Sequence, residues 1–306
     1  MGPTASGKTA LAMQLHDLLP CEIISVDSVQ VYKGLDIGTA KPHAQKLRSY
    51  PHHLIDIREP EIPYSVAEFR RDALLKMQNI VAKGSIPLLV GGSMLYFKAL
   101  TQGIAELPPA NKHVRCKIDK IACRYGWSEI HNRLAKVDPE TSRRLHANDS
   151  QRLQRAMEVY ILTGKTLTAF HEEQVNNLPY HYINIAIAPG ERKFLHEQIA
   201  QRCQQMFESG FIDEVRQLRA RGTLNLHLPS MRSVGYRQAW EFLESTENNG
   251  EIENLIEKCV IATRQLAKKQ LTWLKSWRNV SWFDSLSETL LADVMSIVSC
   301  FSFRQK

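Results

Sequence analysis

The sequence predicts an α/β protein in which a parallel sheet is interrupted by an all-helical insertion. Three observations predict this class. Short apolar runs alternate with helical patterns over residues 1–100, residues 111–175 have helical periodicity without a convincing strand, and the alternation returns at residues 181–188. Strand–helix alternation is typical of parallel sheets covered by helices on both faces.

The composition is that of an ordinary globular chain. Its 306 residues suit one large domain or two smaller ones, and 43% of them are hydrophobic. No apolar run reaches the ~18 residues of a membrane span, and no secretory leader is recognisable. Six scattered cysteines without CxxC spacing fit reduced thiols better than disulfides or a zinc site. We therefore expect a cytoplasmic protein that does not associate with membranes.

The first hundred residues supply three expected strands and one clear helix. Residues 22–26 (EIISV) and 86–90 (IPLLV) are expected to be buried strands, and residues 53–57 a weaker one. Residues 65–83 carry an apolar stripe at helical spacing. The stripe consists of Val66, Phe69, Ala73, Met77 and Ile80. Residues 103–109 (GIAELPP) form a breaker segment and predict a domain boundary.

The remainder of the chain is mostly helical. Asp138 and Asp149 have the pattern of helix starts within the insertion. Strands are expected at residues 181–188 and 280–284. Helices are expected at residues 191–209, 212–221, 236–244 and 252–276. We therefore assign residues 1–107 and 181–306 to the α/β core domain and residues 108–180 to the helical insertion.

Positive charge is concentrated in two segments. The net charge is +7, from 39 cations and 32 anions. Residues 111–165 hold 12 cations and 6 anions, and residues 258–278 hold six cations and no acid. Such segments indicate a polyanionic partner such as a nucleic acid, although a solvated helix face gives the same pattern.

A phosphate-binding loop begins the chain. Residues 2–9 match the pattern G-x-x-x-x-G-K-[ST] in full. They are Gly2, Pro3, Thr4, Ala5, Ser6, Gly7, Lys8 and Thr9. The glycines let backbone N–H groups surround phosphate oxygens, Lys8 adds a cation and Thr9 a hydroxyl ligand for Mg²⁺. The alternative is an ordinary glycine-rich turn.

Such a loop normally follows a buried strand, which the first residues do not supply. We therefore expect the sequence upstream, in frame, to encode a short apolar strand that belongs to the core domain. A protein that includes this strand should be more stable, because a central strand buries several apolar side chains.

Two polar residues follow the expected strands. Asp27 comes directly after residues 22–26, and Ser93 follows residues 86–90. The carboxyl ends of parallel strands face the ligand crevice. Asp27 is expected either to take a proton or to bind Mg²⁺, with a turn cap as the alternative. Ser93 is expected to contact phosphate or to cap the following helix.

These motifs together resemble the tRNA dimethylallyltransferases, also called tRNA isopentenyltransferases, of the bacterial type. The resemblance is carried by GPTASGKT, ISVDSVQVYKGLDIGTAKP and LLVGGSMLYFKAL, and it continues through NDSQRLQRAMEVY, SVGYRQ and TRQLAKKQLTWL. It implies a phosphate-loop nucleotide-kinase-like fold with an inserted helical domain. From the proline break and the positive charge of residues 108–180, we expect this domain to close over RNA. It also implies transfer of a dimethylallyl group from dimethylallyl diphosphate to N6 of adenosine 37 in tRNA.

The resemblance implies a role for each matching residue. The loop at residues 2–9 would hold the donor diphosphate rather than ATP, and Asp27 would accept the N6 proton. Ser93 stands where the family usually has Thr, and Arg115 matches an arginine at the reacting centre. The stretches implied to contact tRNA comprise Asp27, Ser28, Val29, Gln30, Gln151, Arg152, Leu153, Gln154, Arg155, Arg232, Ser233, Val234, Gly235, Tyr236, Arg237, Lys268, Lys269, Gln270, Leu271, Thr272, Trp273, Leu274 and Lys275.

The expected partners are therefore dimethylallyl diphosphate, Mg²⁺ and the anticodon stem-loop of tRNA, bound by a monomer. Two other functions compete with this interpretation. A phosphate-loop kinase of a small hydroxylated metabolite would share the loop but leave the basic insertion unexplained. An RNA-binding module with a vestigial loop would bind RNA without forming a product.

Overall fold

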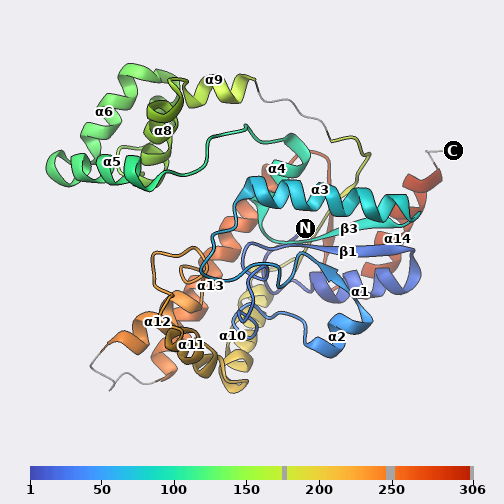
Figure 1. Ribbon diagram of the computed structural model, residues 1–306. Helices are drawn as coiled ribbons and strands as arrows, with labels where there is room; N and C mark the ends of the chain where they lie inside the picture. Colours follow the sequence, from blue (N-terminus) through green and yellow to red (C-terminus); the bar gives the residue numbers. More distant parts are fainter. Residues whose placement is uncertain (174–177, 246–251, 304–306) are drawn as a thin grey trace. The chain divides into compact units, whose positions relative to one another are not determined.

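The computed structural model describes residues 1–173, 178–245 and 252–303 (Figure 1). The chain divides into two compact units, one formed by Met1–Lys98 with Tyr180–Lys306 and the other by Ala99–Pro179. We call them the core unit and the helical unit. The boundary suggested by the proline break, at residues 107 and 108, lies within the helical unit.

One sheet of the core unit carries the strands expected early in the chain. β1 (Cys21–Val26) lies between β2 (His52–His53) and β3 (Ile86–Gly91), and both neighbours are parallel to it. Ile24 of β1 pairs with Leu89 of β3. Both strands predicted from apolar runs are present, as apolar and β-branched side chains favour. Burial is confirmed for β1 only, because in β3 Ile86 is exposed and residues 87–90 are half-buried.

A second sheet is formed by two strands from the later part of the chain. β4 (Asn184–Ala188) and β5 (Val280–Asp284) pair in parallel. The Met1 amino group donates to the Ile185 carbonyl at 2.6 Å, and the Ile187 amide donates to the Met1 carbonyl at 3.0 Å. All strand pairs are parallel as predicted, but they form two sheets instead of one. The strand expected ahead of the phosphate loop stays a prediction.

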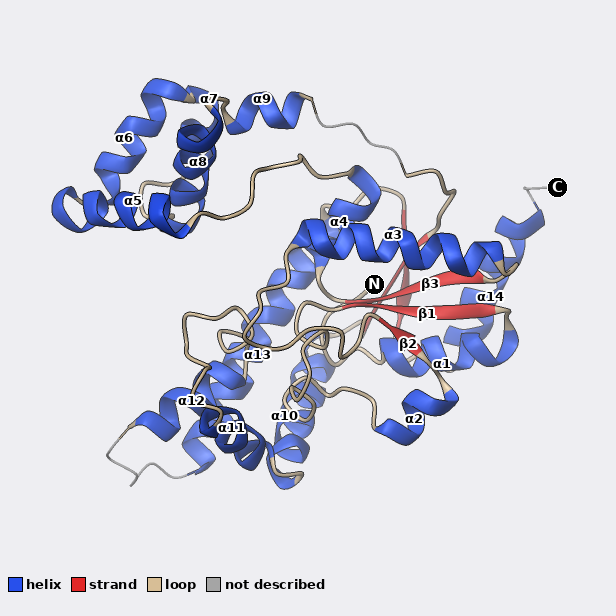
Figure 2. Ribbon diagram, viewed as in Figure 1, coloured by secondary structure: helices blue, strands red, loops and turns tan. Residues whose placement is uncertain are grey.

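Helices cover both faces of the three-stranded sheet. α1 (Lys8–Leu18) and α3 (Val66–Ala82) both contact β1 and β3, and they lie on opposite sides of the sheet (Figure 2). The start of α3 is fixed by a reciprocal capping box between Ser65 and Glu68. Its predicted apolar stripe is buried at Phe69, Ala73, Met77 and Ile80.

The other helices of the core unit come mainly from the second half of the chain. They are α2 (Ala44–Ser49), α4 (Met94–Gln102), α10 (Arg192–Glu208), α11 (Phe211–Ala220), α12 (Tyr236–Glu244), α13 (Ile252–Lys275) and α14 (Leu290–Phe303), of which α4 crosses the boundary between the units. α10 and α13 pack through a buried apolar cluster. The cluster contains Leu195, Ile199, Cys203, Val260 and Ala267. This packing fixes two long helices to each other.

The helical unit has its own core. Its helices are α5 (Lys112–Tyr125), α6 (Trp127–Val137), α7 (Pro139–Arg144), α8 (Ser150–Thr163) and α9 (Leu167–Glu172). Their shared core contains Val114, Ile118, Ala122, Ile130, Leu134, Leu153 and Ala156. Asp138 and Asp149 cap α7 and α8 by accepting from backbone amides, which confirms both predicted helix starts.

Some local predictions were wrong. The strand expected at residues 53–57 ends at His53, because Leu54 and Asp56 have left-handed backbone angles (φ of 67° and 54°). The strand expected at 181–188 begins only at Asn184. The helical character predicted for residues 111–175 is confirmed over the described part, residues 111–173, which forms five helices without a strand. The helices α2 and α14 were not predicted.

In the described part of the chain, no helix is both long enough and apolar enough to cross a membrane.

Candidate active site

The phosphate loop leads directly into α1, whose first residue is Lys8. Gly7, the residue before the helix, has a φ of 77°, a left-handed conformation that favours glycine. No side chain caps this end of α1. The first N–H groups of the helix are therefore available to a ligand, and the helix dipole favours an anion there.

Lys8 lies within this loop rather than in open solvent. Its ammonium group donates to the Pro3 carbonyl. The pKa of Lys8 is lowered to about 7, mainly by burial and also by the positive charge of Arg202, while the negative charge of Asp27 opposes both effects. The ligand-free loop therefore holds a desolvated cation that an incoming polyanion would stabilise.

Arg202 is a functional candidate that the sequence analysis missed. It comes from α10, and burial lowers its pKa while the charge of Asp27 raises it. The structure thus brings Lys8, Arg202 and Asp27 within electrostatic reach of one another. No sequence signal marks Arg202, because a single arginine among glutamines is ordinary for the polar face of a helix.

Asp27 directly follows β1, as predicted. Its Oδ1 accepts from the backbone amides of Val29 at 2.8 Å and Gln30 at 3.2 Å. The turn cap considered from the sequence is therefore present. This cap engages one carboxylate oxygen and orients the group. Among the described residues, no hydrogen bond is found to Oδ2, so this oxygen can serve as a proton acceptor.

Ser93 follows β3 and lies beside the loop that carries Asp27. Its hydroxyl accepts from the Ser28 amide at 3.0 Å and donates to the Ser28 hydroxyl at 3.3 Å. Its own amide donates to the carbonyl of Val26, the last residue of β1. Ser93 thus joins the ends of β1 and β3, which is the edge where a ligand is expected in a parallel sheet.

Gln270 of α13 connects the phosphate loop to the loop after β3. Its Oε1 accepts from the Thr4 amide at 2.8 Å, and its Nε2 donates to the Gly92 carbonyl at 2.9 Å. A side chain at position 92 would place its Cβ 2.4 Å from that Nε2. Both polar atoms of Gln270 are therefore engaged within the core unit.

Thr9, the expected Mg²⁺ ligand, is exposed at the start of α1. The Thr9 hydroxyl can be one oxygen ligand of Mg²⁺, because this ion keeps several waters and binds mainly through substrate phosphates. No cluster of three or more acidic, histidine or cysteine side chains suited to a metal occurs among the described residues.

Arg115 and Arg155 lie in the helical unit, where both bind one buried carboxylate. Glu158, which has no exposed surface, accepts from Arg115 through two bonds (2.9 and 3.0 Å) and from Arg155 at 2.7 Å. Burial would raise the pKa of Glu158, but the hydrogen bonds from Arg115, the Asn111 amide and Arg155 outweigh it and lower the pKa. Arg155 also donates to the Pro108 carbonyl at 2.7 Å.

Arg152 has different surroundings from Arg155, although the two are one helical turn apart. Its side chain is 72% exposed and, within the described residues, pairs only with Asp149, at 3.1 Å. Arg155 is 28% exposed. The alternative considered from the sequence, an ordinary solvated helix face, therefore fits Arg152 but not Arg155.

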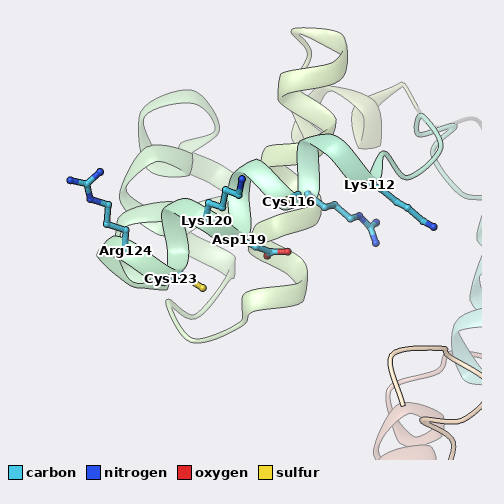
Figure 3. Close-up of a pocket in the computed structure, with 7 residues that line it drawn as sticks. Lys112, Cys116, Asp119, Lys120, Cys123 and Arg124 are labelled. Atoms are coloured by element: carbon cyan, nitrogen blue, oxygen red, sulfur yellow. The ribbon is translucent and has the colours of Figure 1, made fainter. Parts of the chain in front are cut away.

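A shallow cavity of about 570 Å³ lies along α5 (Figure 3). It is lined by four cations, two cysteines and one acid. They are Lys112, Arg115, Lys120, Arg124, Cys116, Cys123 and Asp119. This surface has the excess of positive charge that an RNA backbone requires.

The other predicted tRNA stretches combine exposed and buried residues. Lys268, Lys269 and Lys275 are exposed on α13, and Trp273 is 38% exposed. In contrast, the side chains of Leu153, Tyr236 and Leu274 are fully buried. Tyr236 donates its hydroxyl to Glu214, which lies inside the core unit. The buried members support the fold, so only the exposed ones can form a surface for RNA.

Comparison with known proteins gives one consistent result. Residues 30–277 match the family model described as IPP transferase. The tRNA isopentenylpyrophosphate transferase of Bacillus halodurans is 34% identical with a TM-score of 0.70, covering 97% of this chain and 93% of that one. The corresponding protein of Staphylococcus epidermidis is 32% identical with a TM-score of 0.67, covering 98% and 97%. A eukaryotic dimethylallyltransferase acting on tRNA is 26% identical with a TM-score of 0.80, covering 99% and 78%.

Proposed function

The chain belongs to the IPP transferase family, and from this premise we propose that it transfers a dimethylallyl group from dimethylallyl diphosphate to N6 of adenosine 37 in tRNA, releasing diphosphate. The single observation that carries the proposal is the juxtaposition of a phosphate loop, two desolvated cations and one carboxylate in the core unit. The kinase alternative has no support from the comparisons.

The reaction breaks the bond between the allylic carbon and the diphosphate oxygen, and it forms a bond between that carbon and N6. The exocyclic amine of adenine is a weak nucleophile, so the leaving group must be stabilised strongly. The loop amides, Lys8 and Arg202 supply positive charge where the departing diphosphate takes the electron pair. The Oδ2 of Asp27 accepts the N6 proton.

Mg²⁺ bound with the diphosphate would add Lewis-acid charge, and the Thr9 hydroxyl would be its ligand from the chain. Ser93 holds the loop that carries Asp27 and lies at the same sheet edge as the phosphate loop. The assignment of Arg115 to the reacting centre remains part of the proposal.

The adenine must leave its base stack, as bases do in other base-modifying enzymes, to reach the donor.

The phosphate-loop, nucleotide-kinase-like character of the core unit and the insertion of the helical unit are likewise part of this proposal. They are supported by the loop sequence, by the parallel strands and by the division of the chain. The exposed cations along α5 and α13 would bind the anticodon stem-loop. We place the reaction in the cytoplasm, where the free cysteines would remain reduced.

The deciding experiment incubates an anticodon stem-loop that contains adenosine 37 with the protein, Mg²⁺ and dimethylallyl diphosphate. The expected result is an RNA heavier by one dimethylallyl group, together with free diphosphate. A stem-loop with guanosine at this position is the control and should not gain mass. ATP turnover with a small hydroxylated acceptor, and no modified RNA, would support the kinase alternative and overturn the proposal.

The unequal burial of the two arginines on α8 gives a paired prediction. Arg152→Glu should leave the fold intact and weaken tRNA binding. The slope of log Kd against log salt concentration should decrease by the amount that corresponds to the loss of about 1 to 2 phosphate contacts. Arg155→Glu should instead unfold the helical unit, because it places a second carboxylate against the buried Glu158. Salt-dependent RNA binding and circular dichroism distinguish the two variants. An unchanged salt slope in Arg152→Glu would show that this arginine does not contact RNA.

The lowered pKa of Lys8 predicts how the stability of the ligand-free protein depends on pH. The pKa of Lys8 falls from 10.5 to about 7 on folding, so burying the charged form destabilises the fold. This penalty is fully present below about pH 7 and is lost progressively as the pH rises toward 10.5. Lys8→Met removes the penalty. The variant should therefore melt at a higher temperature than the wild type at pH 6.5, with a smaller difference at pH 9. A constant difference would contradict the assigned pKa.

A further inference from the structure

Gln270 is fixed in space by the helix that carries it. Its neighbours one turn away on either side, Ala267 and Leu274, are buried. α13 packs against α10 through an apolar cluster, and Gln270 itself is half-buried. A side chain that projects from such a rigid helix can hold mobile loops in a defined place.

The two loops that Gln270 joins approach each other closely. A Cβ at position 92 would lie 3.2 Å from the Gly2 carbonyl and 2.4 Å from the Gln270 Nε2. Only glycine leaves room for this contact. The Gln270 side chain accepts from the Thr4 amide of one loop and donates to the Gly92 carbonyl of the other. Its carboxamide group therefore connects the phosphate loop to the start of α4.

From Gly92 the contacts continue to the proposed base. The next residue, Ser93, accepts from the Ser28 amide, and Ser28 directly follows Asp27. A continuous path thus runs from Thr4 of the phosphate loop through Gln270 to Asp27. The path joins the group that would hold the donor to the group that would accept the proton.

We propose that Gln270 is a positioning residue that sets the phosphate loop and Asp27 in their relative places, and that it does not bind tRNA itself. The effect of Gln270 on catalysis rests on the proposed function. The resemblance assigns Gln270 to a stretch that contacts tRNA, but both of its polar atoms are engaged inside the core unit. The side chains of the neighbouring Lys268 and Lys269 are exposed, so they can still contact tRNA.

The test compares Gln270→Met with Gln265→Met. Methionine has nearly the length of glutamine and removes both hydrogen bonds without adding charge. Gln265 is an exposed glutamine on the same helix and serves as the matched control. We measure kcat at saturating tRNA, the Kd for tRNA and the Kd for inorganic diphosphate, with the melting temperature of each variant.

Gln270→Met is expected to lower kcat about tenfold or more, because misplaced reacting groups lose much of their effective concentration. The Kd for diphosphate should rise about fivefold or more, since the Thr4 amide is no longer held in place. The Kd for tRNA should stay within about twofold of the wild type. Gln265→Met should match the wild type in all three measurements.

Two results would overturn the inference. The first is an unchanged kcat and diphosphate Kd in Gln270→Met. The second is a rise in the tRNA Kd that accounts for the whole loss of kcat/KM, which would make Gln270 a tRNA contact. If the wild type modifies no RNA, the proposed function fails. Weaker diphosphate binding by Gln270→Met than by Gln265→Met would still support the positioning of the loop.

Discussion

Asp27→Asn should lower kcat by about 100-fold or more while leaving the fold and the affinity for tRNA unchanged. The amide has the shape of the carboxylate, and its oxygen can still accept from the amides of Val29 and Gln30. It cannot accept the N6 proton, which removes the contribution of general base catalysis. Single-turnover rates with preformed protein–RNA complex measure this step directly.

A matched control is available in the same unit. Asp17 is an exposed aspartate on α1 that accepts from the Tyr50 hydroxyl. Asp17→Asn should turn over like the wild type. Near-normal turnover of Asp27→Asn would leave Asp27 with the structural role that its turn cap already gives it, and another group would have to take the proton.

Lys8→Ala should lower kcat/KM by about 100- to 1,000-fold, the range measured when a donor that stabilises a developing negative charge is removed. The variant loses the mobile cation of the phosphate loop, and the loop also loses the bond from Lys8 to the Pro3 carbonyl. In the core unit, Arg202 and the loop amides then remain to stabilise the leaving diphosphate, together with any Mg²⁺ bound to it. Turnover and the Kd for inorganic diphosphate should both be affected.

The same variant should lose no stability, because removing Lys8 also removes the cost of burying its charge, as in Lys8→Met. Loss of activity without loss of stability is expected where a site is organised for a ligand rather than for the fold. Lys83→Ala is the control, since Lys83 is 62% exposed and forms an ion pair with Glu22, away from the phosphate loop in sequence. RNA modification by Lys8→Ala at the wild-type rate would exclude the phosphate loop from the reaction and would support a vestigial loop.

Much of the site could be predicted from sequence because its parts lie at the ends of regular elements. The phosphate loop is a contiguous pattern, and Asp27 and Ser93 follow strands whose apolar runs are unmistakable. A parallel sheet brings such positions to one edge whatever the rest of the fold. The bonds between Ser93 and Ser28 show the two loops meeting there.

Arg202 and Gln270 could not be predicted as parts of the site in this way. Each is a polar residue on an amphipathic helix, and its partners are distant in the chain: Thr4 lies 266 residues from Gln270. Helical periodicity reports which face is buried and says nothing about what that face meets. The distinction between Arg152 and Arg155 is partly of the same origin. Glu158 lies one helical turn after Arg155, but only packing buries this carboxylate and brings Arg115 to it.

The sequence by itself determined the family, the parallel strands and the phosphate-loop motif that we propose as the diphosphate site, because these depend on contiguous motifs and on local apolar patterns. Only the tertiary structure decided that the strands form two sheets and that residues 54–57 leave the strand after His53. The tertiary structure also decided which polar side chains remain available to contact RNA. Gln270 lies in a basic stretch that suggests RNA, yet its amide is used between two loops. The physical reason is that a hydrogen bond depends on where two distant segments meet, and local sequence does not encode that meeting place.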